Sequence, residues 1–226
     1  MRRRPAIQQI SGRTRCSTGG PAVCRQGARM SVMSGSDPTR PQSAGVKLTY
    51  DDLVHFPDDG KRHELIDGEH YVAPSPNTRH QRVVLNLTSL LWIFLRQNRI
   101  GEVFGSPLDV IFSDFDVVEP DLLFVSKERG AVVTEKNIRG APDLAVEVGS
   151  PATRRRDEKT KLQLYERFGV SEYWVVDPDL DVIKVYRLVE GRYQRAAELT
   201  LEAHDVLTTP LLPGLQLPLQ DIFPES

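Results

Sequence analysis

The chain of 226 residues is long enough for one large domain or two small ones, and a single domain of this size buries a substantial core. Charged side chains make up 27% of it and apolar ones 39%, which is typical of a globular protein and excludes a fibrous or wholly disordered chain. No run approaches the roughly eighteen apolar residues of a membrane-spanning helix, so a membrane is not an expected partner.

The net charge of −2 combines two regions of opposite sign. Residues 1–46 hold eight arginines, no lysine and one acid, Asp37, which leaves +7. Residues 47–226 hold 21 basic and 30 acidic side chains, which leaves −9. A body with this excess of acids excludes a generic basic coat for nucleic acid, but it is compatible with an enzyme that has a local basic cleft.

Residues 1–46 are expected to form a disordered, arginine-rich tail, because their Gly, Pro and Ser turns come with no apolar periodicity. Their richness in Arg and Ser would suit a nucleic-acid arm or a transit peptide. We favour a simpler interpretation, an upstream extension with the natural start at Met30 or Met33, because no apolar face accompanies the arginines. The remaining residues, 47–226, are expected to form a single domain.

Cysteine usage indicates a reducing, cytoplasmic location. The two cysteines, Cys16 and Cys24, both lie in the tail at a spacing that matches no zinc pattern. The body has no cysteine, which excludes a disulfide framework there. The tail also lacks the apolar stretch of a secretory signal.

The pattern of the body predicts helices and short strands in succession. In chain order we expect a short helix over 50–55 capped by Thr49, strands over 62–66 and 69–72 joined by Asp67-Gly68, a long helix over 78–97 capped by Asn77, strands over 101–104, 108–112, 121–125 and 144–148, a helix over 157–168, a strand over 172–176, and a hairpin of 182–188 and 193–198. A Pro- and Leu-rich end should wrap the body with little regular structure.

This order predicts an α/β (α+β) fold with a mixed central sheet flanked by helices. The first hairpin would precede the sheet and the last would extend it. The segment Leu144-Ala145-Val146-Glu147-Val148 is apolar except for its acid, which favours a central strand buried on both faces.

Two carboxylates in the predicted sheet are candidates for chemistry. Asp121 opens an apolar strand, and Glu147 lies inside one, where a charge is costly without a partner or a metal. If the two strands are neighbours, both acids can reach one point, and a hard divalent cation suits their oxygens. The alternative places Glu147 on a solvated face and makes Asp121 an ordinary strand start.

A lysine on the following helix could complete such a site. Lys161, Leu164, Tyr165 and Phe168 form one helical stripe, so Lys161 should point inward, whereas Lys159 should face solvent. An inward lysine needs an anion to face, and Glu147 with a bound phosphate would supply one. The alternative is that Lys161 extends its charge to solvent from the first turn.

The chain resembles the PD-(D/E)xK nuclease superfamily in the order of three features. These are an acid after a proline, an acid on a buried strand and then a lysine. The strict motif places the lysine two residues after the acid, where this chain has Gly149, so the match requires the variant in which Lys161 of the next helix replaces it. Over about 140 residues the chain resembles, more specifically, the Uma-two family of putative restriction endonucleases. The matching blocks are ELIDGE (64–69), EPD (119–121), VEVGSP (146–151), Asp157 with Lys161 and Tyr165, and GVSEYW (169–174).

The resemblance implies a restriction-endonuclease-like core and magnesium-dependent hydrolysis of DNA phosphodiester bonds. Asp121 and Glu147 would hold Mg²⁺, with Mn²⁺ as a substitute, and Lys161 would stabilise the developing charge. Glu64 is the candidate for a further catalytic acid, with an exposed hairpin acid as the equal alternative. Cleavage of both strands would favour a homodimer.

Basic side chains near these residues could contact DNA phosphates. Arg79, His80 and Arg82 occupy the first turns of the long helix, and we favour an ordinary solvated face for them. Residues 154–156 are three adjacent arginines beside the predicted site, either a phosphate contact or a solvated loop. A catalytically inactive nuclease fold that acts as a binding or interaction module is the second functional hypothesis.

Overall fold

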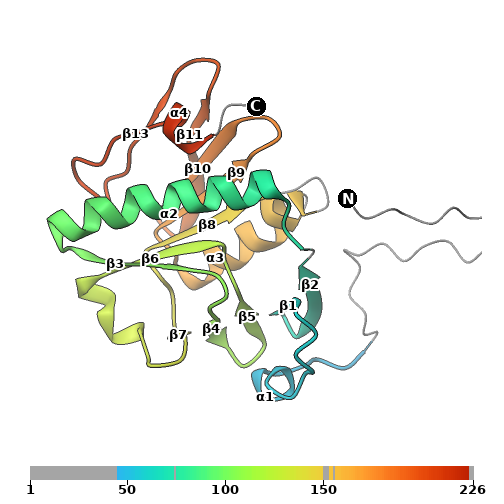
Figure 1. Ribbon diagram of the computed structural model, residues 1–226. Coiled ribbons are helices and arrows are strands. Elements are labelled where there is room, and N and C mark those ends of the chain that lie inside the picture. Colours follow the sequence, from blue (N-terminus) through green and yellow to red (C-terminus); the bar gives the residue numbers. More distant parts are fainter. Residues whose placement is uncertain (1–44, 74, 150–152, 155, 224–226) are drawn as a thin grey trace, which may run out of the picture. The chain divides into compact units, whose positions relative to one another are not determined.

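The computed structural model describes residues 45–73, 75–149, 153–154 and 156–223 (Figure 1). All but the last two residues of the predicted tail, 1–46, lie outside this part of the chain. Among the described residues, no helix is both long and apolar enough to span a membrane.

A mixed sheet of six strands forms the centre of the fold, in the order β11-β10-β9-β8-β6-β3. Its strands are β3 (Gly101–Gly105), β6 (Leu122–Ser126), β8 (Leu144–Val148), β9 (Glu172–Asp177), β10 (Val182–Val189) and β11 (Arg192–Thr200). Strands β8 and β9 run parallel and the other neighbours antiparallel. A parallel pair needs a crossover, and the helical residues 156–168 lie between these two strands in the chain.

Helix α2 (Thr78–Asn98) covers one face of this sheet (Figure 1). Asn77 caps it through a hydrogen bond from the His80 amide to Asn77 Oδ1 at 2.8 Å. The residues that it buries against the sheet repeat at helical spacing, and they are Val83, Leu87, Leu91 and Leu95. The C-terminal segment packs on the same core, through β12 (Val206–Leu207), β13 (Leu217–Pro218) and α4 (Leu219–Ile222).

A second sheet of five strands and helix α3 (Leu162–Phe168) lie against the opposite face. The second sheet has the order β2-β1-β5-β4-β7, from β1 (Arg62–Ile66), β2 (Glu69–Ala73), β4 (Val110–Ser113), β5 (Asp116–Val118) and β7 (Ile138–Arg139). Because side chains alternate along a strand, Val146 of β8 faces α2, and Ala145 faces the second sheet. Glu147 therefore points between the two sheets.

The structure confirms the expected mixed α/β fold and most of its elements. The first hairpin turns at Asp67 and Gly68, both with positive φ of 53° and 75°, which suits a two-residue turn. A Cβ at position 68 would lie 2.6 Å from Lys47 Cβ, so this turn requires glycine. Helix α1 (Tyr50–Leu53) is shorter than expected, and a 3-10 helix, η1 (Lys127–Val132), follows β6.

Several expectations about the sheets and one helix are corrected. Strands β5 and β7 were not predicted, and they are only three and two residues long. The last hairpin does extend the main sheet as expected, since β10 pairs along β9. The helix expected over 157–168 begins as a π-helix, η2 (Arg156–Lys161), before α3 continues it.

Candidate functional site

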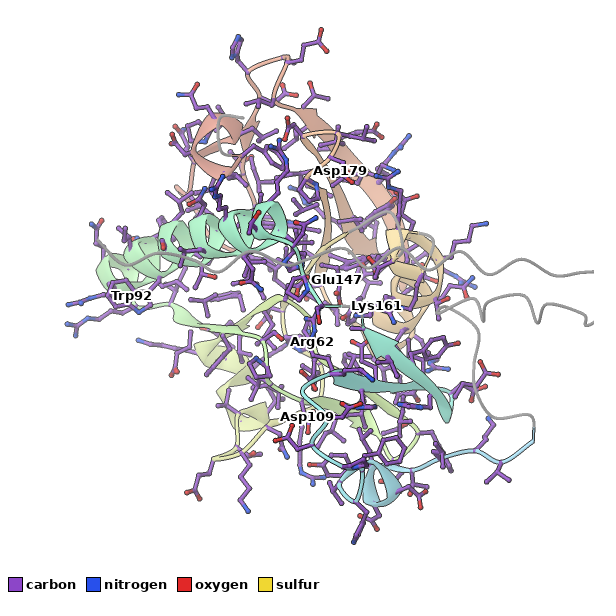
Figure 2. The ribbon with its side chains drawn as sticks, turned by 45° about the vertical axis from the view of Figure 1, so that its right-hand side comes forward. Arg62, Trp92, Asp109, Glu147, Lys161 and Asp179 are labelled. Carbon is purple, nitrogen blue, oxygen red and sulfur yellow. The ribbon has the colours of Figure 1, made fainter. Side chains whose placement is uncertain are left out.

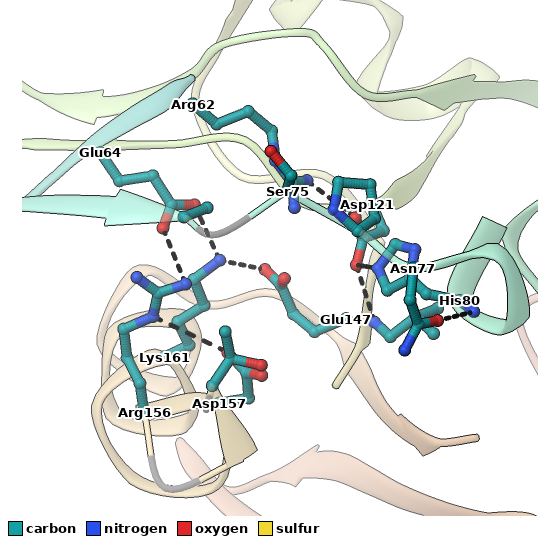
Figure 3. Close-up of a pocket in the computed structure, with 14 residues that line it drawn as sticks. Arg62, Glu64, Ser75, Asn77, His80, Asp121, Glu147, Arg156, Asp157 and Lys161 are labelled. Atoms are coloured by element: carbon teal, nitrogen blue, oxygen red, sulfur yellow. Dashed lines mark hydrogen bonds and ion pairs between the residues drawn. The ribbon is translucent and has the colours of Figure 1, made fainter. Parts of the chain in front are cut away.

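A pocket of about 240 Å³ lies between the two sheets and contains all four predicted site residues (Figure 3). The second sheet contributes Arg62 and Glu64 from β1, and the main sheet contributes Asp121 and Glu147. His80 of α2 also lines the pocket, as do three residues of η2, which are Arg156, Asp157 and Lys161. In Figure 2 Arg62, Glu147 and Lys161 lie together in the middle of the body, away from Trp92 in the C-terminal half of α2.

The two acids of the main sheet lie on neighbouring strands, as a shared site requires. Strands β6 and β8 pair antiparallel with Leu122 opposite Val146, and this register places Asp121 opposite Glu147. Asp121 is 3% exposed and Glu147 4% exposed. The alternative that Glu147 lies on a solvated face is therefore wrong.

Asp121 is held as a charged carboxylate by three donors. Arg62 Nη1 donates to Oδ1 at 2.7 Å, while His80 Nε2 and the Val148 amide donate to Oδ2 at 3.2 and 2.9 Å. Burial by itself raises the pKa of Asp121, but the hydrogen bond from His80 and the charge of Arg62 outweigh it and lower that pKa to about 2.

The interpretation of the first turns of α2 as a solvated face is wrong for His80, which is buried on Asp121. Arg79 is also engaged, because it donates to the carbonyl of Pro178 and to Asp181 at the turn after β9. Arg82 is exposed, as expected. The burial of His80 could have been suspected from its position three residues after the capping Asn77. That position lies in the first turn of α2, which faces the end of the sheet.

The pKa of Glu147 is shifted upward, opposite to that of Asp121. Its Oε1 accepts hydrogen bonds from Lys161 Nζ and from the Tyr165 hydroxyl, both at 2.7 Å. Burial raises the pKa of Glu147 to about 8, against the attraction of Lys161 and with the help of the neighbouring acids Asp157 and Asp121. Burial therefore outweighs the attraction between this carboxylate and the Lys161 ammonium.

Lys161 points into the pocket, and Lys159 is exposed, as the helical stripe predicted. Lys161 is 2% exposed, and its Nζ lies 2.7 Å from Glu147 Oε1 and from Glu64 Oε1. Burial lowers the pKa of this ammonium, but the two carboxylates reverse the effect and raise it, so Lys161 is charged. The alternative that Lys161 extends its charge to solvent is therefore wrong.

Glu64 is buried at 1% exposure, so the exposed-hairpin alternative is wrong for it. Its Oε1 accepts from Lys161 Nζ and from the Glu119 amide at 3.1 Å, and Arg156 Nη2 lies 3.5 Å from Oε2. Although burial raises the pKa of Glu64, Lys161 and Arg156 lower it overall. Of the three arginines at 154–156, Arg154 pairs with Asp177 on the main sheet.

Two further residues of the pocket, Arg62 and Asp157, and Tyr165 beside it were not predicted as site residues. Arg62 is two positions before Glu64 on β1 and shares its face, which is the signal that could have found it. Asp157 is buried, and burial raises its pKa. Its position depends on the wide turn of η2, which a regular helical pattern does not represent. Tyr165, expected only as a core residue, hydrogen-bonds Glu147.

The donor set fits a divalent cation of the magnesium kind. Among the described residues, no three His, Cys, Asp or Glu side chains converge as a complete protein metal site. Mg²⁺ does not need one, because it keeps several waters and binds through one or two carboxylates together with substrate phosphates. Asp121 and Glu147 would be two such carboxylates, because both line one pocket.

Comparisons with known proteins give the family. A crystal structure of a putative nuclease belonging to DUF820, from Anabaena variabilis, has a similar fold, with a TM-score of 0.66 and 23% sequence identity over 78% of this chain and 97% of that one. Among curated proteins no relative matches. The Uma2 family model, described as putative restriction endonuclease, matches residues 50–220. Because this match spans most of its length, the chain belongs to the Uma2 family of putative restriction endonucleases.

Proposed function

We propose that this protein is a metal-dependent endonuclease that hydrolyses phosphodiester bonds of DNA. One observation carries the proposal. Two buried carboxylates on neighbouring strands, Asp121 and Glu147, share a pocket with a buried, charged Lys161. A fold with no site to maintain would gain little from burying these charges, because desolvation makes each of them costly.

Each side chain has a distinct task in this reaction. A divalent cation held by Asp121 and Glu147 would polarise the scissile phosphate and lower the pKa of the attacking water. Lys161 lies beside Glu147 and would place its ammonium against the negative charge that develops on the phosphate. Glu64 keeps that ammonium charged and in place, and Tyr165 orients the Glu147 carboxyl.

Basic side chains around the same pocket support a nucleic-acid substrate despite the acidic body. Arg62 and Arg156 reach the pocket from opposite sides, from β1 and η2. A guanidinium matches a phosphate group in geometry and charge. DNA rather than RNA is proposed from the family description.

The test is nicking of a supercoiled plasmid in Mg²⁺ or Mn²⁺ by the full chain and its variants. We expect Asp121→Asn to abolish cleavage. We expect Lys161→Met to slow it roughly a hundredfold, the size of one lost transition-state contact. Lys159→Met is the matched control, since this exposed lysine belongs to the same turn, and it should leave the rate unchanged.

Circular dichroism must show that each variant is folded, because Lys161→Met leaves two buried acids without their shared partner. Full activity of Asp121→Asn would contradict the metal site. Wild-type protein that binds DNA but does not nick it in either metal would favour the inactive binding module instead. Conversion of the plasmid directly to linear DNA would support a homodimer with two sites.

A further inference from the structure

Asp121, a proposed metal ligand, is already neutralised by an arginine in this structure. Arg62 Nη1 lies 2.7 Å from Asp121 Oδ1, and both groups line the pocket. A divalent cation at the same carboxylate would be repelled by the guanidinium, because two like charges only a few ångströms apart in a partly dry site interact strongly. The ion pair and the metal therefore compete for Asp121.

Arg62 differs from the other two donors to Asp121 in its freedom to move. The Val148 amide belongs to a central strand, and His80 is buried in the first turn of α2. Arg62 reaches across from the second sheet on a long side chain that is 25% exposed, against 5% for the Asp121 side chain. Its second hydrogen bond, from Nη1 to Ser106 Oγ, is long at 3.3 Å.

Space for a rotated guanidinium exists beside the site. Arg62 and Asp121 also line a neighbouring pocket of about 390 Å³, which Lys61 and the acids Asp58 and Glu119 border. A guanidinium that leaves Asp121 can therefore stay at the mouth of the site. There its planar fork would suit a phosphate group of a nucleic acid.

We propose that Arg62 is an exchangeable cation of the nuclease site. Before the metal binds, Arg62 neutralises Asp121. When the metal takes that place, Arg62 turns away and binds a phosphate of the DNA. This inference rests on the proposed function, and it makes metal binding and DNA binding mutually reinforcing, since each favours the same position of Arg62.

The first test is Mn²⁺ binding to the full chain without DNA, measured by titration calorimetry. If Arg62 is paired with the Asp121 carboxylate in about nine molecules of ten, Arg62→Gln should bind Mn²⁺ about tenfold more tightly than wild type does. Arg62→Lys keeps the charge and should stay close to wild type. Arg79→Gln is the matched control, because Arg79 pairs with Asp181 and the Pro178 carbonyl and does not touch Asp121.

The second test is the salt dependence of binding to a DNA duplex, with EDTA and with Ca²⁺ as a cation expected to support binding without turnover. Each phosphate contact contributes about −0.9 to the slope of log K against log salt. We expect the wild-type slope to steepen by about one contact when Ca²⁺ is added. In Arg62→Gln this additional contact should be absent.

The outcomes distinguish a failure of the proposed Arg62 exchange from a failure of the proposed nuclease function. If wild type binds neither the cation nor DNA, the nuclease proposal and the exchange both fail. If wild type binds both, but Arg62→Gln weakens or leaves unchanged the Mn²⁺ affinity and still shows the steeper slope, the nuclease proposal stands and the exchange is wrong. Tighter Mn²⁺ binding together with the lost contact supports the exchange.

Discussion

Asp121 and Glu147 lie side by side but have opposite titration behaviour. Asp121 is surrounded by donors, and its pKa is lowered to about 2, whereas burial among other acids raises the pKa of Glu147 to about 8. Without metal, Asp121 therefore keeps its charge to a much lower pH than its neighbour Glu147 does. The two residues should consequently affect stability with opposite sign.

Glu147→Gln should stabilise the metal-free protein at alkaline pH by more than about 1 kcal/mol, because a tenfold difference in proton affinity between the folded and unfolded chain corresponds to about 1.4 kcal/mol. The folded chain binds the Glu147 proton more tightly than the unfolded chain does. Wild-type stability should therefore fall as pH rises from about 4.5 through about 8. Urea unfolding in EDTA at pH 5 and pH 9 measures this. A variant less stable than wild type at pH 9 would contradict the raised pKa.

Asp121→Asn should destabilise the protein at pH 7 by on the order of 2 kcal/mol, since the amide cannot attract Arg62 and His80 as the carboxylate does. The pKa of Asp121 is lowered, so its contribution is present above the unfolded value near 3.8 and is lost as pH falls through about 2. The difference between variant and wild type in urea should thus shrink toward pH 2. A difference that is independent of pH would indicate a packing effect.

At the scale of the elements, those with strong local signals could be predicted and those defined by tertiary pairing could not. The sequence signals for the turn at Asp67 and Gly68 and for the cap at Asn77 are local. The first hairpin therefore turns, and α2 begins, where the sequence predicts. Strand β7 has only two residues, and its pairing with Val110 and Ile111 of β4 defines it. The π-turn of η2 likewise depends on the burial of Asp157 against the sheet, which no helical periodicity expresses.

The same distinction applies to the site. Asp121, Glu147 and Lys161 could be found because a charge stands within an apolar pattern. Arg62 and His80 stand in polar surroundings in the sequence, so their burial became visible only when β1 and the start of α2 were placed beside Asp121. The exposed-acid alternative for Glu64 could not be excluded for the same reason.

The C-terminal end of α2 offers a test at this scale. Arg99 follows the helix in the left-handed conformation, with φ of 51°, and its side chain is exposed. Glycine adopts this conformation without steric cost, so Arg99→Gly should stabilise the protein by about 0.5–1 kcal/mol. Asn98→Gly, one residue earlier and still helical, should instead cost up to about 1 kcal/mol. Equal changes in the urea midpoint would show that α2 does not end there.

At the scale of the whole chain, Lys47 and Leu48 both contact the first hairpin of the body. The Leu48 amide donates to the Gly68 carbonyl at 2.9 Å, and Lys47 pairs with Asp67. A chain that starts at Lys47 should therefore fold, and it should melt within a degree or two of the full-length protein. Calorimetry of the two chains checks this. A large drop would contradict the interpretation of residues 1–46 as a disordered tail, and weaker DNA binding only at low salt would identify an electrostatic arm.

The pocket takes Arg62 and Glu64 from one sheet and Asp121 and Glu147 from another, and this division has a kinetic consequence. The β1–β2 hairpin ends its sheet, with β2 as the outer strand, so it can open locally without unfolding the main sheet. A ligand that contacts both sides must leave before that opening can occur. Amide hydrogens of β1 and β2 should accordingly exchange more slowly with solvent when cation and DNA are bound, while those of β10 and β11 keep their rates.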